Sequence, residues 1–357
     1  MIEIVLPSIN IPESVIVLFE ALIKALIFVI YLLTSAALTV WFERRVAGIA
    51  QDRLGPNRTG PFGLLQPFSD VFKLFFKEDF VPANADRFTH ALAPCICVFV
   101  ATMLYTVVPL GHYVTLNGRD IYLGVAPNLN IGILVVLAMT SFGVYGFMLA
   151  GWSSGNKYSL LGGLRSSAQM ISYELAMGMS VVGVVMVTGS MGTNDIILHQ
   201  SDWHWNVILQ PLGFLIYFIT ALAEINHTPF DFPEAEQELV AGYNTEYSSM
   251  RFGMFYLSEY ANVAASSVII VILFFGGWQI PYLQEFTGLE DGSVLLALIQ
   301  IGTTILKVIF FIFLIIWIRW TLPRFRYDQL MHLGWYVLLP LSLINLVVTA
   351  CVIYFLL

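Results

Sequence analysis

Hydrophobic residues fall in long runs along most of the chain, and short polar segments separate these runs. A helix needs about 20 apolar residues to cross the hydrocarbon core of a bilayer, which is about 30 Å thick. The runs of that length cover residues 14–41, 89–110, 128–151, 166–188, 206–224, 255–276, 293–320 and 333–357. The pattern therefore predicts an all-α, polytopic integral membrane protein with about eight transmembrane helices, forming a single membrane domain of residues 1–357.

The composition excludes several classes of protein. Hydrophobic residues make up 58% of the 357 residues, charged residues make up 11%, and the mean hydropathy is +0.79. An ordinary soluble domain has about 45–50% apolar and about 25% charged residues, so neither a soluble enzyme nor a disordered chain fits. The net charge of −8 also argues against a nucleic-acid partner.

Positive charges gather in alternate loops between the predicted helices. Thirteen of the sixteen Lys and Arg residues fall on one side, and they are Arg44, Arg45, Arg53, Arg58, Lys73, Lys77, Arg87, Lys157, Arg165, Arg251, Arg319, Arg324 and Arg326. Loops rich in Lys and Arg stay on the cytoplasmic side of a membrane. We therefore expect these loops to face inward and both termini to lie on the outer side.

Two of the inward-facing loops are long, and they cover residues 42–88 and 225–254. In the first loop, Gln66, Asp70 and Lys73 recur at helical spacing, and Leu and Phe residues such as Phe68 occupy the other faces. This arrangement is typical of a helix that lies along the membrane surface. We expect one interfacial amphipathic helix near residues 63–77.

Carboxylates inside the predicted spans are the main candidates for function. Glu174, Glu224 and Glu259 fall in the inner half of three consecutive predicted helices, where an ionisable group costs a few kcal/mol to insert. The second long loop adds a group of acids, namely Asp231, Glu234, Glu236, Glu238 and Glu246.

Arg251 is the only Lys or Arg residue in that second loop, so we expect the loop acids to have no cation beside them. In a low-dielectric site, a carboxyl group without a nearby cation has a raised pKa. A row of such groups can exchange protons near neutral pH. The alternative is a solvated acidic loop that docks against a partner protein.

The sequence contains no motif for a nucleotide, flavin, haem or metal cluster. It has no Walker A motif, no G-x-G-x-x-G fingerprint, no nucleophile elbow and no H-E-x-x-H motif. The three Cys and six His residues do not form a metal-binding cluster. We therefore expect that this chain binds no cofactor itself, and that another subunit supplies any redox step.

Motifs in both long loops are similar to those of a known membrane protein. They are Trp-Phe-Glu-Arg-Arg at 41–45, Gln-Asp-Arg-Leu-Gly-Pro-Asn-Arg-Thr-Gly at 51–60, Gln-Pro-Phe-Ser-Asp at 66–70, Ala-Glu-Ile-Asn at 223–226, and Glu-Gln-Glu-Leu-Val with Gly-Tyr-Asn-Thr-Glu-Tyr at 236–247. From about residue 14 to the C-terminus, the chain resembles the H-type membrane subunit of bacterial NADH:quinone oxidoreductase, respiratory complex I. That protein is the equivalent of mitochondrial NADH dehydrogenase subunit 1.

The resemblance implies a subunit of a proton-translocating enzyme in the bacterial cytoplasmic (inner) membrane. Such a subunit forms the chamber through which a long-tailed quinone, such as ubiquinone, enters from the bilayer. The resemblance assigns this chamber to Arg44, Arg45, Arg53 and Asp70, with Phe68 on the surface helix at the entrance. The partners implied are peripheral-arm subunits, which carry FMN and iron–sulfur clusters and contact the quinone headgroup, together with antiporter-like membrane subunits and membrane lipid.

The eight acids at positions 174, 224, 231, 234, 236, 238, 246 and 259 match the acidic funnel of the family, which couples quinone reduction to proton transfer. Two positions differ from the usual pattern of the family: His227 stands where Arg is usual, and Gln237 stands where Ser is common. Because His titrates near pH 6.5, we expect the neighbouring carboxylates to titrate differently from those of relatives that carry Arg. Similar pH–activity profiles for the wild type and His227→Arg would count against this.

Three other interpretations remain open. The first is the homologous membrane subunit of a hydrogenase-linked complex, the second is a stand-alone ion-coupled transporter, and the third is a purely structural anchor. The Arg-rich first loop disfavours the hydrogenase-linked subunit, the two long inner loops disfavour the transporter, and the carboxylates within the spans disfavour the anchor.

Overall fold

The computed structural model of the chain describes residues 13–116, 119–126, 128–201, 204–233, 236–282 and 292–356. Within these residues, seven helical segments are long and apolar enough to cross a membrane. They are α1 (Glu13–Ala50), α3 (Arg87–Thr106), α4 (Gly132–Ser153), α5 (Lys157–Thr188), α10 (Ser249–Phe274), α12 (Val294–Thr321), and a last segment in which α13 (Tyr327–His332), the π-helical turn η3 (Leu333–Leu338) and α14 (Leu339–Leu356) follow one another directly. The prediction of an all-α, polytopic membrane protein is confirmed.

The fifth expected span is not one helix. Residues 206–224 form two helices, α7 (Asn206–Leu209) and α8 (Pro211–Glu224), and the backbone leaves helical geometry at Gln210. Proline disfavours a helical residue before it and has no N–H to donate, so the chain breaks here and a new helix starts. The 14 residues of α8 span about 21 Å, which is less than the bilayer core, so the prediction of one continuous helix is wrong.

Short elements occupy the connections between the long helices. A hairpin of β1 (Tyr113–Leu116) and β2 (Arg119–Tyr122) pairs antiparallel, with Tyr113 opposite Tyr122. The other short elements are η1 (Pro61–Gly63), α2 (Gln66–Phe76), α6 (Thr193–His199), α9 (Glu236–Leu239) and η2 (Gly242–Asn244). The hydropathy pattern did not predict the hairpin.

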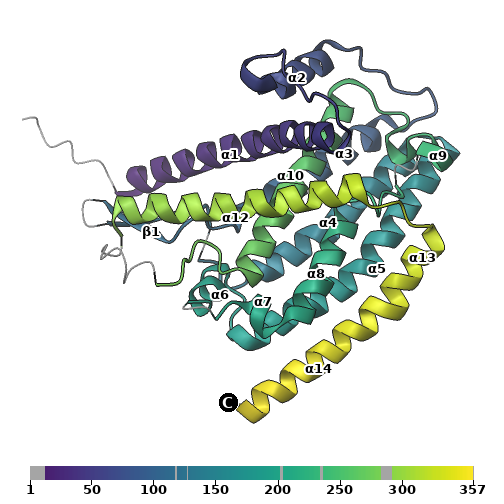
Figure 1. The fold of residues 1–357 in the computed structure, drawn as a ribbon. Coiled ribbons are helices and arrows are strands. Elements are labelled where there is room, and N and C mark those ends of the chain that lie inside the picture. Colours follow the sequence, from purple (N-terminus) through teal and green to yellow (C-terminus); the bar gives the residue numbers. More distant parts are fainter. Residues whose placement is uncertain are drawn as a thin grey trace, which may run out of the picture.

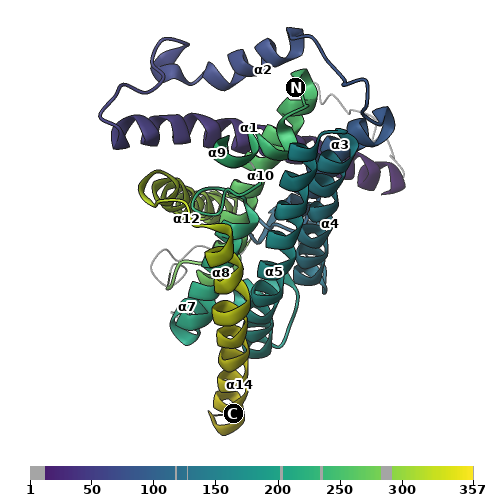
Figure 2. The ribbon, with the colours of Figure 1, turned by 90° about the vertical axis from the view of Figure 1, so that its right-hand side faces the viewer.

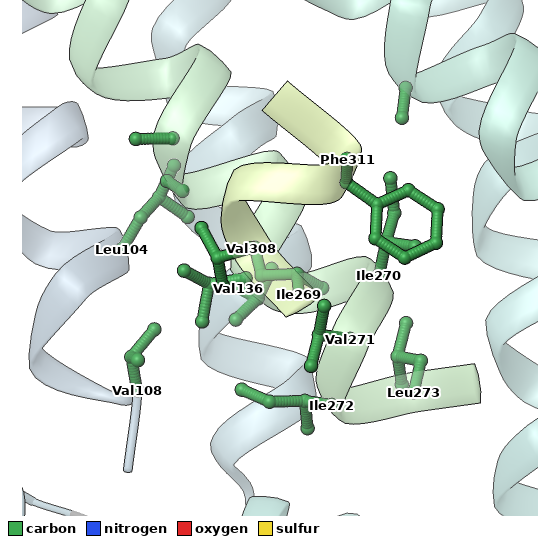
Figure 3. Packing of buried hydrophobic residues seen from close by; sticks show 14 of the residues in the cluster. Leu104, Val108, Val136, Ile269, Ile270, Val271, Ile272, Leu273, Val308 and Phe311 are labelled. Carbon is green, nitrogen blue, oxygen red and sulfur yellow. The ribbon is translucent and has the colours of Figure 1, made fainter. Parts of the chain in front are cut away.

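The core of the bundle forms around α10. This helix packs against α1, α3 and α12, and nearly all of its residues from Val263 onward are buried. A helix that is apolar on every face belongs inside a bundle. In Figure 3, Ile269, Ile270 and Val271 of α10 lie among side chains from neighbouring helices, with Leu104 and Phe311 close by. Glu259 lies on the same helix, four residues before this buried stretch begins.

A half-buried lysine holds the turn at the C-terminal end of α10. The Nζ atom of Lys307, in α12, donates hydrogen bonds to the carbonyl oxygens of Phe275, Gly277 and Gln279 at 2.8, 2.9 and 2.9 Å. Phe275 caps the end of α10, where helix carbonyls lack partners within the helix and carry partial negative charge. Gly277 and Gln279 belong to the turn that follows, so an ammonium group suits this cluster of carbonyls. This contact explains how the bundle accommodates Lys307 among apolar residues.

The helix α2 lies outside the bundle. Figure 1 shows α1 and α12 side by side, tilted against the other long helices, with α2 running above α1. Figure 2 shows that α2 stays on the far side of α1 from α5, α8 and α14. A separate amphipathic helix is therefore present where it was expected, at Gln66–Phe76 instead of 63–77.

Candidate functional site

The two long loops meet at one end of the bundle. The backbone N–H of Phe80 donates to Ser248 Oγ at 2.9 Å, and Ser249 Oγ donates to the carbonyl oxygen of Leu74 at 3.0 Å. Arg251 pairs with Asp79 at 3.2 Å. Residues that are about 170 positions apart in the sequence thus share one surface, and the first of the two loops brings seven Lys and Arg residues to it.

Three of the expected chamber residues hold the segment of α2 against α1. Arg44 Nη1 lies 2.6 Å from Asp70 Oδ2. Arg45 and Trp41 both donate to the carbonyl oxygen of Phe62, each at 3.1 Å. The helix α1 therefore anchors both the start and the middle of the segment that carries the amphipathic helix.

The remaining two chamber residues lie apart from these three. Arg53 is exposed, and its Nε donates to Gln51 Oε1 at 2.6 Å. Phe68 belongs to an exposed apolar face of α2 that also includes Phe72, Phe75 and Phe76. This face is too hydrophobic for water, so it is suited to lipid or to another apolar surface.

Glu174 and Glu224 share an enclosed space between helices. Both line a cavity between α4, α5 and α8, together with Thr140 and Met170. The cavity volume is about 10 Å³, and an adjoining space of about 30 Å³ also reaches Glu224. Ser141 of α4 donates a hydrogen bond to the carboxylate of Glu174. A space of about 10–15 Å³ holds one water molecule, so the two spaces together have room for a few waters beside the carboxylates.

Glu259 belongs to a second cluster, which α1, α10, α12 and the second long loop build together. His227 Nδ1 lies 3.3 Å from Glu259 Oε1, and His227 Nε2 lies 3.2 Å from Arg319 Nη1. Arg319 Nη1 also lies 3.0 and 3.1 Å from the two carboxylate oxygens of Glu43. Burial, reinforced by the positive charge of Arg319, holds the pKa of His227 well below its ordinary value of 6.5, so the imidazole is neutral.

The turn after α8 connects the two clusters. Gln169 of α5 is fully buried, and its Nε2 donates to the carbonyl oxygens of Ala223 and Phe230 at 2.7 and 2.8 Å. These two carbonyls flank the segment that carries Glu224 and His227. The side chain of Gln169 thus fixes the geometry between the end of α8 and the loop.

The prediction that the loop acids lack a nearby cation is wrong for two of them. Asp231 pairs with Arg324 at 2.6 Å, and Glu238 pairs with Arg165 at 2.5 Å. Both arginines come from other parts of the chain, so counting charges within the loop did not find them. Glu246 accepts a hydrogen bond from Asn156 at 2.8 Å. Glu234 lies outside the described residues, and Glu236 begins α9.

Sequence reasoning did not single out Glu43 and Arg319. Glu43 is only 6% exposed, and Arg319 stands among apolar residues in the last turn of α12. The charge pattern places Arg319 with the inner loops, and Glu43 stands out only as part of a motif. The position of Arg319 between Ile318 and Trp320 was the signal available, because buried charges in proteins are paired.

Among the residues that the structure describes, no group of three or more His, Cys, Asp or Glu side chains is placed to hold a metal ion. The features that stand out instead are carboxylates, one neutral imidazole and one guanidinium.

Comparison with known proteins identifies the family. The family model for NADH dehydrogenase matches residues 23–350. The chain is 53% identical to NADH-quinone oxidoreductase subunit 8 of Rhodothermus marinus over 93% of this chain and 96% of the relative. It is 50% identical to the H-type subunit of NADH-quinone oxidoreductase of Salinibacter ruber over 89% and 92%, and 46% identical to the protein of the same name in Flavobacterium johnsoniae over 96% and 97%. The resemblance drawn from the loop motifs is confirmed, and the chain belongs to the NADH dehydrogenase family, whose members named here are subunits of NADH-quinone oxidoreductase.

Proposed function

We propose that this chain is the H-type subunit of a proton-translocating NADH:quinone oxidoreductase and that it forms the passage for quinone. In this proposal the chain couples quinone reduction to proton transfer through the acids at positions 174, 224, 231, 234, 236, 238, 246 and 259, which are called the acidic row below. The observation that carries this proposal is the shared cavity of Glu174 and Glu224. This cavity lies close to the second cluster, formed by Glu259, His227, Arg319 and Glu43. Gln169 holds the turn between the cavity and the cluster.

The quinone passage begins at α2. A quinone has a polar headgroup on a long apolar tail, and the exposed aromatic face of α2 offers a surface of matching character. The Arg44–Asp70 pair and Arg45 supply charge and hydrogen-bond donors directly behind that face. Phe68 lies at the membrane side of the entrance, and Arg53 lies farther along the loop that contacts partner subunits.

Redox chemistry comes from the partners in this proposal. Peripheral-arm subunits carry FMN and the iron–sulfur clusters and complete the site for the quinone headgroup. The inner loops of this chain form the docking surface for these subunits, and the antiporter-like subunits lie alongside in the same bacterial inner membrane. Both termini face the outer side.

Proton coupling uses the carboxylates of the row. A carboxylate in an enclosed site responds strongly to a new charge nearby, because the local dielectric constant is low. When quinone reduction changes the charge in the chamber, the affinity of Glu259 and Glu224 for protons changes. Waters in the small cavity connect Glu224 with Glu174 and extend the path into the membrane.

Photo-crosslinking tests the quinone passage. A photoreactive quinone analogue bound to the assembled complex should label peptides within 42–88, and excess natural quinone should compete with the labelling. The hairpin at residues 113–122 is the control region, because it lies between the outer ends of α3 and α4. Labelling that misses 42–88, or that natural quinone does not reduce, would contradict the passage.

Substitution of the carboxylates tests the coupling. Glu174→Gln and Glu259→Gln remove one titratable group each and keep the shape of the side chain. We expect both variants to impair quinone-linked turnover more than assembly. A fully active, intact complex after both substitutions would refute the coupling role.

Assembly size distinguishes this function from the alternatives. On a native gel, the tagged chain should migrate with a very large complex that has NADH dehydrogenase activity. A large complex with hydrogenase activity would indicate the hydrogenase-linked subunit, and a small oligomer would indicate a transporter.

A further inference from the structure

His227 is enclosed by charged and titratable groups. The side chain is 3% exposed. Arg319 faces it from α12, and Glu259 and Tyr260 face it from α10, with the His227 and Tyr260 ring centroids 5.9 Å apart. Glu43 of α1 reaches the same cluster through Arg319. The imidazole therefore lies directly between a guanidinium and a carboxylate.

The partners of His227 determine which ring nitrogen carries the proton. A guanidinium is always protonated and only donates hydrogen bonds, so Nε2 of His227, 3.2 Å from Arg319 Nη1, acts as the acceptor. A neutral imidazole has one acceptor nitrogen and one N–H. The proton is therefore on Nδ1, which lies 3.3 Å from Glu259 Oε1 but makes no hydrogen bond with it in this structure.

We propose that His227 is a positioning residue, which as a neutral bridge holds the guanidinium of Arg319 through Nε2 and keeps the Nδ1 N–H beside the carboxylate of Glu259, and does not carry protons itself. This inference rests on the proposed coupling role of the acidic row and assigns a role within it. Because Nε2 is occupied by a permanent donor, the ring has no free nitrogen with which to take up a second proton.

The bridge sets the relative placement of one fixed positive charge and one titratable carboxylate. Thr228, the next residue, donates from Oγ1 to the carbonyl oxygen of Arg319 at 2.8 Å. The loop therefore holds both the backbone and the side chain of Arg319. A loss of the bridge leaves the guanidinium with one acceptor fewer and allows it to move relative to Glu259.

The test compares two substitutions at His227 in the assembled complex. His227→Gln keeps one acceptor for Arg319 and N–H donors for Glu259 but cannot titrate, whereas His227→Leu keeps neither function. We expect quinone-linked NADH oxidation per assembled complex to fall roughly tenfold to a hundredfold in His227→Leu, as for the loss of a hydrogen bond to a charged group. His227→Gln should restore most of the rate and keep the pH profile of the wild type.

His90 offers a matched control. It is also a fully buried histidine beside an arginine, with Nδ1 3.1 Å from Arg251 Nη1, but it stacks on Tyr247 next to Glu246, and its arginine is Arg251 instead of Arg319. His90→Leu should lower assembly without changing the pH profile of the complex that does assemble. Only His227→Leu should change that profile.

Three results would overturn the inference. If His227→Gln loses as much turnover as His227→Leu, His227 carries protons. If His227→Leu has the rate and the pH profile of the wild type, the bridge has no role. If His90→Leu reproduces the shifted profile, the effect is structural. Failure of the proposed function looks different, because Glu259→Gln would then leave coupled turnover unchanged whatever the His227 variants do.

Discussion

The buried ion pair between Glu43 and Arg319 gives a quantitative prediction. The Glu43 side chain is 8% exposed, and both of its carboxylate oxygens contact Arg319 Nη1 at 3.0 and 3.1 Å. The substitution Glu43→Gln removes the negative charge at almost constant volume. Breaking a buried pair by removing one partner costs about 3–5 kcal/mol, because the remaining charge is left uncompensated.

We expect a value near the lower end, about 3 kcal/mol, for Glu43→Gln. Arg319 is 25% exposed and keeps its contact with His227, so its charge is partly compensated. The measurement is thermal inactivation of the purified complex, together with the fraction of the chain that enters the full-size complex. Asp328→Asn is the control, because its pair with Arg326 is highly exposed, and such pairs contribute about 0–1 kcal/mol.

A double-mutant cycle decides whether the effect belongs to the pair. Glu43→Gln combined with Arg319→Met removes both charges and should be less destabilising than the sum of the two single substitutions. Strictly additive effects would refute the reasoning, and so would a loss for Glu43→Gln no larger than for Asp328→Asn.

Three further predictions concern the turn, the imidazole and the entrance. Gln169→Leu removes one hydrogen bond from each of two carbonyl groups, which keep backbone donors from Asn226 and Phe232, so we expect a loss of about 1–3 kcal/mol in stability, and an unchanged thermal midpoint would contradict this. The pKa of His227 is lower in the folded chain than its ordinary value of 6.5, so below that pH the unfolded chain takes up a proton that the folded chain does not. The stability of the folded chain should therefore fall as the pH drops below about 6.5. His227→Gln should remove that component from a plot of the thermal midpoint against pH. Arg53→Ala should raise the apparent KM for quinone, and unchanged steady-state kinetics would exclude Arg53 from the passage.

The membrane spans were largely predictable because bilayer thickness imposes a minimum length of apolar helix. The prediction was wrong at 206–224, where the apolar residues continue through Gln210 and Pro211 although the backbone does not stay helical. The start of α5 at Lys157 was also missed. Hydropathy marks only the part of a helix that lies in lipid, and α5 extends into the polar loop region.

The candidate site was partly predictable for a different reason. Ionisable residues within spans are costly, so Glu174, Glu224 and Glu259 stand out in the sequence alone. Their surroundings depend on contacts between distant segments, as when Glu43 of α1 meets Arg319 of α12 across 276 residues. Such pairings arise from helix packing, and no local pattern of the sequence encodes them.

The central claim is that the carboxylates beside the small cavity couple quinone reduction to proton movement. The most direct measurement follows NADH oxidation and proton uptake together in proteoliposomes that contain the Glu224→Gln complex. The account predicts that quinone-linked oxidation and proton translocation both fall, while NADH oxidation by a water-soluble electron acceptor stays at the level of the wild type. Proton translocation at the rate and the proton-to-NADH ratio of the wild type would contradict the account.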